Sequence, residues 1–388
     1  MKTETIELPS LAPGASFQLK MCTFGSGRSS RSAYVQAGLH ADEHPGLLVA
    51  HHLMRLLTDL ERKGQIAGTV VVCPFANPVG LGQRIFGMPT GRFNLENGEN
   101  FNRAFPEIAS DIAAMSGNET STGNDVALVK RLFAQLLERH RSDDTVGALK
   151  FALLREALKH DLVLDLHCDT AGVLHLYANR AQAARAELLA RAMGISTVLV
   201  EDHAGGRPFD ESFTQPWRTA VEAGLIDPHK SGFCASIELR GQGDVDDATA
   251  LEDARGILRF LVQEQLIEPE GGDAGGVDFH PLSGRSKELD RPDVFPLEGA
   301  SHLRAPATGI VVYRKHPGDR VSYGELLAEI VALDGGPDTA RAEVRSDVDG
   351  VFLVGQHFRF VRVGQRVALL AGAARLPGRE PGKLLNDF

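Results

Sequence analysis

Short apolar runs alternate with amphipathic segments over the first two-thirds of the chain. The apolar runs at 69–73, 162–167 and 235–239 are typical of strands that are buried on both faces of a parallel sheet. A further strand is predicted over 32–38, and apolar positions at the 3.6-residue spacing of a helix cover 44–62. Other helical patterns lie near 125–140, 147–160, 181–193 and 246–266. The alternation predicts an α/β fold with a mixed, mainly parallel sheet flanked by helices.

The pattern changes near residue 268, where a segment rich in Gly and Pro begins and the helical periodicity ends. Beyond about residue 300, short strands and glycines replace it. We therefore predict an α/β domain over 1–268, a linker over 269–299 and a small all-β domain over 300–388. Residues 107–124, rich in Ser, Gly, Thr and Asn, are predicted to form an exposed loop.

The predicted β domain contains a weak internal repeat. Residues 304–312 match 345–353 at an offset of 41 residues, which indicates two similar β units. Residues 302–372 thereby resemble the biotinyl/lipoyl-like two-fold fold, whose carrier members present a lysine for the cofactor in the turn between the halves. The corresponding turn here, 334–343, contains no lysine. We therefore expect a structural domain rather than a cofactor carrier.

Composition and charge restrict the classes of partner. The chain of 388 residues is 43% hydrophobic and 24% charged, as in soluble globular proteins, and no run approaches the ~18 apolar residues of a membrane span. The net charge of −10 disfavours nucleic acids and acidic membranes as partners. The N-terminus lacks the apolar stretch of a secretory signal and the four cysteines form no CxxC pair, so a cytoplasmic protein with reduced thiols is expected. A homo-oligomer is compatible with this composition.

Side chains that can bind a metal ion follow two of the predicted strands. His40 and Glu43 lie three residues apart in the segment GLHADEHPG, where a strand gives way to a helix. Two such ligands, with one distant ligand, can hold a zinc ion and leave one position for water. Asp165 and His167 end another strand on the same side, at the edge where α/β sheets place their sites. Taken singly, each pair is more often a surface pair or a buried, hydrogen-bonded histidine.

Two other segments carry charges where a hydrophobic core would not place them. Arg84, Arg92 and Arg103 occur with several amides in a Gly-rich, turn-rich stretch, which is either a solvated loop or a pocket for a carboxylate. Glu238 falls in an apolar strand, where an unpaired carboxylate is costly. It either pairs with Arg240 or faces a site, where it could act as a general base.

The order of these motifs, HxxE, NPxG, NxNRxFP, DLH and IELRG, resembles the succinylglutamate desuccinylase/aspartoacylase family over roughly residues 25–372. That family is a branch of the zinc carboxypeptidase-like fold. The resemblance implies that His40, Glu43 and His167 hold one Zn²⁺ per chain. It also implies that Glu238 is the catalytic glutamate.

The resemblance extends to the arginine-rich stretch. It implies that Asn102 and Arg103 bind a substrate carboxylate, and that Arg92 or Arg84 polarises the carbonyl that is attacked. Arg92 is favoured, because it is nearer to the Asn-Arg motif. One departure is Ala41, which stands where many family members have glycine, although the implied ligands are retained.

The implied activity is that of a zinc-dependent deacylase, a hydrolase that cleaves the amide bond of a small N-acyl amino acid with zinc-activated water. A zinc carboxypeptidase acting on peptides and an esterase remain alternatives, since the same residues would serve them. A non-catalytic zinc-binding protein is less favoured, because it would not need Glu238. A serine hydrolase is disfavoured by the absence of a GxSxG motif.

Overall fold

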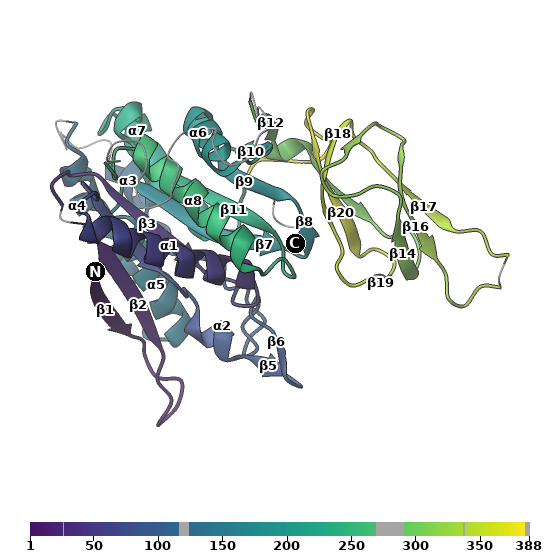
Figure 1. The fold of residues 1–388 in the computed structure, drawn as a ribbon, viewed down its shortest axis with the longest axis horizontal. Coiled ribbons are helices and arrows are strands. Elements are labelled where there is room, and N and C mark those ends of the chain that lie inside the picture. Colours follow the sequence, from purple (N-terminus) through teal and green to yellow (C-terminus); the bar gives the residue numbers. More distant parts are fainter. Residues whose placement is uncertain (26, 116–123, 269–290, 337, 385–388) are drawn as a thin grey trace.

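A nine-stranded sheet forms the centre of the larger part of the molecule (Figure 1). The computed structural model describes residues 1–25, 27–115, 124–268, 291–336 and 338–384. The strands of this sheet are β1 (Lys2–Glu7), β2 (Gln18–Phe24), β3 (Ser32–Ala37), β4 (Thr69–Cys73), β7 (Leu162–Asp169), β9 (Leu174–Asn179), β10 (Thr197–Glu201), β11 (Phe233–Gly241) and β12 (Asp293–Pro296). Their order across the sheet is β1-β2-β4-β3-β7-β11-β9-β10-β12.

The sheet is mixed and mainly parallel, as the sequence predicts. β4, β3, β7 and β11 run parallel to one another, and β9, β10 and β12 form a second parallel group. The antiparallel pairs are β1 with β2, β2 with β4, and β9 with β11. The parallel strands in the middle are apolar on both faces, because helices cover both sides of the sheet.

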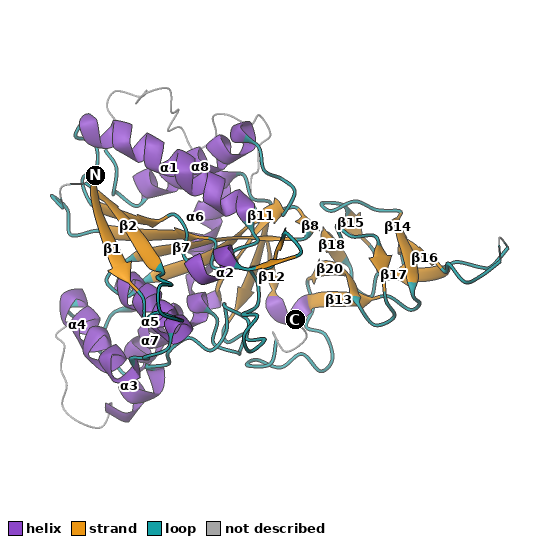
Figure 2. Ribbon diagram, turned by 90° about the horizontal axis from the view of Figure 1, so that it is seen from below, coloured by secondary structure: helices purple, strands orange, loops and turns teal. Residues whose placement is uncertain are grey.

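Figure 2 shows these two helical layers. One contains α1 (His44–Arg62), α6 (Ala183–Met193) and α8 (Asp247–Gln263); the other contains α3 (Ala109–Met115), α4 (Val126–Leu137), α5 (Thr145–Ala157) and α7 (Phe209–Glu222). Leu164 and Leu166 of β7 pack with the first layer, and Val163 packs with the second. The two-residue period of a strand therefore places Asp165 and His167 on the side of α5 and α7.

The predicted loop over 107–124 is wrong in part. Its first half contains α3, whose Ile112 is buried, and Ile108 just before the helix is buried too. These two residues, four apart, lie on one face and pack against the second helical layer. The burial of their side chains outweighs the polar composition of the surrounding sequence. Residues 116–123 lie outside the described part of the chain.

The C-terminal part consists of short strands in two sheets with matching order. Its strands are β13 (Ala300–Arg304), β14 (Gly309–Tyr313), β15 (Arg320–Val321), β16 (Leu326–Val331), β17 (Ala342–Arg345), β18 (Gly350–Gly355), β19 (Phe360–Val361) and β20 (Arg366–Gly372). The sheets run β13-β20-β18-β15 and β17-β16-β14-β19. Each β unit thus gives two strands to each sheet, as expected when two similar units pair about a two-fold axis.

The C-terminal part packs against the large sheet close to the end of β7. β8 (Ala171–Gly172) pairs with β18, and Leu199 of β10 shares an apolar cluster with Leu353 and Leu369. Most of the linker predicted over 269–299 lies outside the described residues, and its described end forms β12 of the large sheet. In the described part of the chain, the four cysteines are unpaired, and no helix has the length and hydropathy needed to cross a bilayer.

Candidate active site

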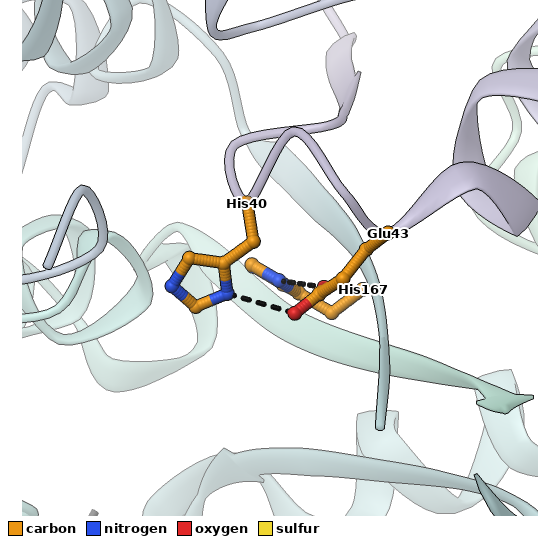
Figure 3. Close-up of side chains that lie close together, drawn as sticks. All are labelled: His40, Glu43 and His167. Carbon is orange, nitrogen blue, oxygen red and sulfur yellow. Dashed lines mark hydrogen bonds and ion pairs between the residues drawn. The ribbon is translucent and has the colours of Figure 1, made fainter. Parts of the chain in front are cut away.

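His40, Glu43 and His167 converge at the carboxyl ends of β3 and β7 (Figure 3). His40 and Glu43 lie on the turn between β3 and α1, and His167 lies on β7. The Nδ1 atoms of both histidines are 2.9 Å from Glu43, His40 from Oε1 and His167 from Oε2. One ligand atom of each residue lies within 4.8 Å of the others. Each side chain is at most 5% exposed, so the cluster is buried.

Close backbone packing positions the turn that carries the first two residues. Gly38 has a φ of +72°, and a Cβ there would meet Leu47 at 2.6 Å. Helix α1 begins directly after Glu43, with Pro45 in its first turn. A Cβ at Gly46 would approach Leu166 to 3.1 Å, so glycine lets the helix lie against β7. The start of α1 is therefore held next to the strand that carries His167.

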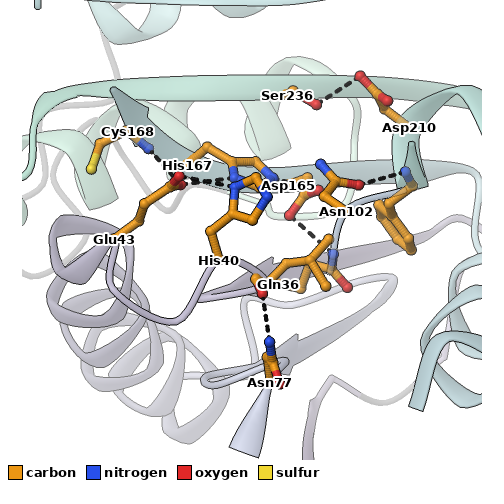
Figure 4. A network of polar contacts seen from close by, with 12 residues as sticks. Gln36, His40, Glu43, Asn77, Asn102, Asp165, His167, Cys168, Asp210 and Ser236 are labelled. Atoms are coloured by element: carbon orange, nitrogen blue, oxygen red, sulfur yellow. Dashed lines mark hydrogen bonds and ion pairs between the residues drawn. The ribbon is translucent and has the colours of Figure 1, made fainter. Parts of the chain in front are cut away.

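Hydrogen bonds from the other ring nitrogen orient both histidines, and Figure 4 shows His167 beside Asp165. His167 Nε2 is 2.9 Å from Asp165 Oδ2, and His40 Nε2 is 2.8 Å from Asn100 Oδ1. Gln36 Nε2 donates to the other oxygen of Asp165 at 3.0 Å. Because both acceptors favour a proton on Nε2, the Nδ1 atom of each ring, which faces Glu43, is the nitrogen available to a metal ion. Metal-binding histidines are fixed by such contacts.

The cluster keeps its carboxylate charged. Burial alone would raise the pKa of Glu43, but the fields and hydrogen bonds of His40 and His167 outweigh burial and hold this pKa well below its usual range. Burial would lower the pKa of His167, but Asp165 and Glu43 raise it well above the ordinary value. Burial and the nearby Arg92 lower the pKa of His40. Two imidazoles and a charged carboxylate, with their second contacts in place, fit a divalent metal ion such as zinc.

Arg92 and Arg103 line the same pocket as the cluster. Arg92 Nη1 donates to Glu43 Oε1 at 3.1 Å and lies 3.2 Å from His40 Nδ1. Arg103 Nη1 donates to the carbonyl of Asn102 at 2.7 Å, and Asn102 Oδ1 accepts from the N–H of Phe209 at 2.8 Å. Burial and the charge of Arg92 lower the pKa of Arg103 to about 10, which leaves it charged at neutral pH.

Glu238 lies beside His167 on the neighbouring strand. The two are register partners in the β11–β7 pair, and both face the side of α5 and α7. Burial, followed by the charge of Glu43, raises the pKa of Glu238 to about 8. Among the described residues, its buried Oε2 has no hydrogen-bond partner. Arg240 binds Asp253 instead, at 2.7 and 3.0 Å, so of the two interpretations of Glu238 the structure favours a carboxylate that faces the pocket.

Two polar residues of the arginine-rich stretch lie apart from the cluster. Arg84 is exposed, and its Nη1 donates to the carbonyls of Leu81 and Gln83 at 2.8 Å. Asn77 caps α2 (Pro78–Gly82) by accepting from the N–H of Gly80 at 2.8 Å. The described residues that line the pocket include Arg92 and Arg103 but not Arg84.

Sequence reasoning missed part of the pocket. The lining also includes Glu201 at the end of β10, and Asp210 and Glu211 in the first turn of α7. No motif surrounds these residues, and α7 was not predicted. The available signal was the apolar run Thr197–Val200, which ends at Glu201 as 162–166 ends at His167. Leu297, just after β12, brings the C-terminal segment to the rim.

Comparison with known families decides the relationship. The model of the succinylglutamate desuccinylase/aspartoacylase catalytic domain matches residues 29–263, more than half of the chain.

The chain belongs to this family.

The predicted family is thereby confirmed, and with it a relationship to deacylases of the desuccinylase and aspartoacylase type. The fold is similar to a family protein from Shewanella amazonensis at 24% identity, covering 96% of this chain and 98% of that chain with a TM-score of 0.80. A family protein from Shewanella frigidimarina is 25% identical, with 96% and 97% covered and a TM-score of 0.77. One from Rhodobacter sphaeroides is 18% identical, with 96% and 95% covered and a TM-score of 0.62. No curated protein matches the sequence significantly.

Proposed function

We propose that the chain is a zinc-dependent deacylase that hydrolyses the amide bond of small N-acyl amino acids. The observation that carries this proposal is the meeting of three kinds of group in one pocket. His40, Glu43 and His167 offer a metal site, Glu238 offers a carboxylate without a protein partner, and Arg103 offers a charged guanidinium. Hydrolysis of an amide that carries a carboxylate needs all three. The family relationship supports the same class of reaction.

His40, Glu43 and His167 would hold the zinc ion through the two Nδ1 atoms and the carboxylate. When bound, the ion supplies Lewis acidity, which makes a water acidic near neutral pH and polarises a carbonyl oxygen. The chain's own contribution is to hold both histidines in one tautomer, through Asp165 and Asn100. Burial of the cluster keeps other water molecules away.

Glu238 would accept the proton of the attacking water and later deliver it to the leaving amine. Its position beside His167 places it next to the metal site, and its lack of a protein partner leaves its oxygens available. The positive charge of a bound ion would lower the pKa of Glu238 from the value of about 8 in the metal-free chain. A carboxylate that is then mostly ionised at neutral pH can act as a general base.

The two arginines of the pocket would have separate roles. Arg103, backed by Asn102, would bind the substrate carboxylate, and Arg92, next to Glu43, would stabilise the negative charge that develops on the carbonyl oxygen. Arg84 lies on the exposed segment beyond α2, and so we assign the carbonyl to Arg92.

The C-terminal part would act as a wall rather than a carrier. We assign it the biotinyl/lipoyl-like fold, on the basis of its two matching sheets and the repeat in its sequence. It contacts the segment that follows His167, where Thr170 Oγ1 donates to the carbonyl of Gly355 at 2.8 Å. A wall at this place would narrow the entrance and favour small amides over long peptides.

A substrate panel tests the proposal. N-acetyl, N-succinyl and N-formyl amino acids should be hydrolysed faster than peptides of several residues by the zinc-loaded protein. Metal analysis should give about one zinc per chain, and His40→Ala should lose both the metal and turnover, whereas His51→Ala on the exposed side of α1 should lose neither. Faster cleavage of long peptides from their C-termini would replace the deacylase with a carboxypeptidase.

A further inference from the structure

Three carboxylates gather on one side of the pocket. Glu201 ends β10, and Asp210 and Glu211 lie in the first turn of α7; all three line the same pocket as the metal cluster and Arg103. Glu201 and Glu211 are buried, with 9% and 3% of their surface exposed, and Asp210 is half-buried. Figure 4 shows Asp210 directed toward Ser236 on β11.

Among the described residues, these carboxylates have no lysine or arginine partner, although Glu211 contacts His203. Asp210 accepts from Ser236 Oγ at 2.8 Å, and Glu211 accepts from the N–H of Gly205 at 2.8 Å and contacts His203. Glu201 is different, because its buried Oε2 has no partner among the described residues. In the part of the chain that the structure describes, no lysine or arginine forms an ion pair with any of the three.

Burial of an unpaired carboxylate is costly, so this arrangement needs a compensating group. Burial, together with the charges of Asp210 and Glu211, raises the pKa of Glu201 well above its usual range. Arg103 is the cation whose field reaches Asp210 and Glu211, but a substrate carboxylate would neutralise it. Another acidic residue near the metal cluster, Asp169, is already paired with Arg366 at 2.7 and 3.0 Å.

We propose that the amine part of the substrate carries a second, protonated amino group, which binds between Glu201 and Asp210. This inference rests on the proposed function and specifies its substrate class. The three carboxylates, Glu201, Asp210 and Glu211, are called the acidic wall below. The preferred substrates are then Nα-acyl diamino acids. Their carboxylate binds Arg103, their amide lies at the metal site, and their side-chain ammonium offsets the negative charge of the acidic wall. N-acyl derivatives of acidic amino acids bring a second negative charge to the same wall and are disfavoured.

Matched substrates test this preference with the zinc-loaded enzyme. Nα-acetyl-ornithine and Nα-acetyl-lysine are compared with Nα-acetyl-norvaline and Nα-acetyl-norleucine, which have the same carbon chains without the terminal amine. We expect kcat/KM to be about 10–100-fold higher for the diamino members, as for hydrogen bonds to charged groups. Nα-acetyl-glutamate should be slower than either. Equal rates, or faster hydrolysis of the neutral or acidic members, overturn the proposal.

Variants locate the effect on the acidic wall. Glu201→Gln keeps the shape and removes the charge, and it should reduce the ratio of kcat/KM between the ornithine and norvaline substrates by about 10-fold. Asp202→Asn removes the adjacent carboxylate, which is about half exposed and bound to Arg180 outside the pocket, and it should leave this ratio unchanged. Asp210→Asn gives a second variant if Glu201→Gln does not fold. An unchanged ratio in every folded variant of the wall assigns the selectivity elsewhere and overturns the proposal.

A binding measurement separates this inference from the proposed function. Calorimetry with free ornithine and free norvaline reports on the wall without any turnover. Tighter binding of ornithine, weakened by Glu201→Gln, supports the cation site even if no N-acyl amino acid is hydrolysed, in which case the proposed function fails alone. Hydrolysis of neutral substrates, together with equal or undetectable binding of both amino acids, would contradict the cation site. The proposed deacylase function would still be supported.

Discussion

Asp165 connects a buried histidine of its own strand, β7, to the neighbouring strand β3. One of its oxygens accepts from His167 Nε2 and the other from Gln36 Nε2, and the side chain is fully buried. Contacts of this kind fix the orientation of a metal-binding histidine and increase its basicity. Under the proposed function, the residue would therefore act on the metal site through His167 and not by contact with the ion.

Asp165→Asn should weaken zinc binding by about 10–100-fold, because the amide cannot accept from both donors in the same way. Competition with a chromophoric chelator measures the affinity. Tyr34→Phe is a matched control one step further out, since the Tyr34 hydroxyl donates to Gln36 Oε1 at 3.0 Å and touches neither His167 nor Asp165. An affinity reduced equally in both variants would mean that general loss of packing, and not the contact with His167, governs the site.

Glu238→Gln should separate chemistry from metal binding. The amide keeps the shape but cannot accept the proton, so kcat should fall by about 10²–10⁴-fold while the zinc content stays near one per chain. The rate of hydrolysis and the metal content are measured on the same preparation. Near-normal turnover in the folded, zinc-loaded variant would assign the base to another carboxylate.

The metal-free protein allows a second test of Glu238, by pH. A carboxyl whose pKa is raised to about 8 in the folded chain stays protonated there at pH values where the unfolded chain is ionised. Its contribution to stability is present below the ordinary pKa of about 4.3 and is lost as the pH rises toward 8. After treatment with a chelator, the melting temperature of Glu238→Gln minus that of the wild type should therefore increase as the pH is raised from 5 to 8. An equal difference at both pH values would mean that Glu238 is already ionised in the folded state.

At the scale of residues, the sequence indicates groups whose chemistry is visible in a short motif. His40 and Glu43 share a turn, and Asp165 and His167 share a strand, so spacing alone suggested that each pair faces one way. The structure brings these pairs together with Glu238. Glu201 and Asp210 escaped notice because their proximity depends on the packing of α7 against β9 and β11, which no local pattern encodes.

Among the elements, helices whose apolar residues recur at helical spacing on one face were predicted most accurately. The predicted helix over 44–62 coincides with α1, and the apolar run over 69–73 coincides with β4. Helix α7 was missed, because Pro216 lies inside it and polar residues fill its first turn; its stability comes from burying Phe209, Phe213 and Trp217 against the second helical layer. β1 and β2 were missed because β1 is an edge strand whose side chains are mostly exposed.

A loop that touches the turn of the metal cluster positions Arg92. A Cβ at Gly91 would approach the N–H of Asp42 to 2.3 Å and the carbonyl carbon of Ala41 to 2.5 Å, and the carbonyl of Gly91 accepts from the N–H of Ala41 at 3.0 Å. Only glycine permits this approach. The backbone of the arginine-rich stretch therefore fixes the place of Arg92 relative to Glu43.

Gly91→Ala should push this loop away and reduce kcat/KM by at least about 10-fold, since small displacements of a catalytic group are costly. Circular dichroism and the melting temperature check that the chain still folds. Gly82→Ala is the control, because the nearest atom to its Cβ would be a ring carbon of Phe17 at 3.8 Å, an ordinary contact. Full activity in a folded Gly91→Ala protein would show that the position of Arg92 does not depend on this contact.

Over the whole molecule, the C-terminal part is joined to the α/β part at the segment that follows His167 of β7. β8 pairs with β18, and the N–H of Val173 donates to the carbonyl of Leu353 at 3.0 Å. Sequence analysis predicted a separate β domain but not this contact, because it joins segments nearly two hundred residues apart with no shared motif. Packing so close to His167 means that the C-terminal part can influence the site through the backbone.

A partly buried ion pair completes this junction. Arg366 of β20 binds both oxygens of Asp169, the last residue of β7, at 2.7 and 3.0 Å, and both side chains are 18% exposed. Burial alone would raise the pKa of Asp169, but Arg366 and the N–H of Thr170 outweigh burial and lower it. The stability that this carboxylate contributes is therefore present above its ordinary pKa and is lost as the pH falls through the lowered value.

Arg366→Met should leave the buried charge of Asp169 unpaired and reduce the free energy of unfolding by about 3 kcal/mol at neutral pH. Asp169→Asn added to Arg366→Met removes that charge and should restore most of the loss, because an apolar side chain beside a neutral amide carries no uncompensated charge. Urea unfolding of the wild type, both single variants and the double variant gives the coupling free energy directly. The single Arg366→Met variant should also regain part of its stability as the pH falls and Asp169 becomes protonated. Additive losses with no coupling would mean that the two parts are held together by the apolar cluster and the β8–β18 pair, and that the ion pair next to the metal site does not stabilise their junction.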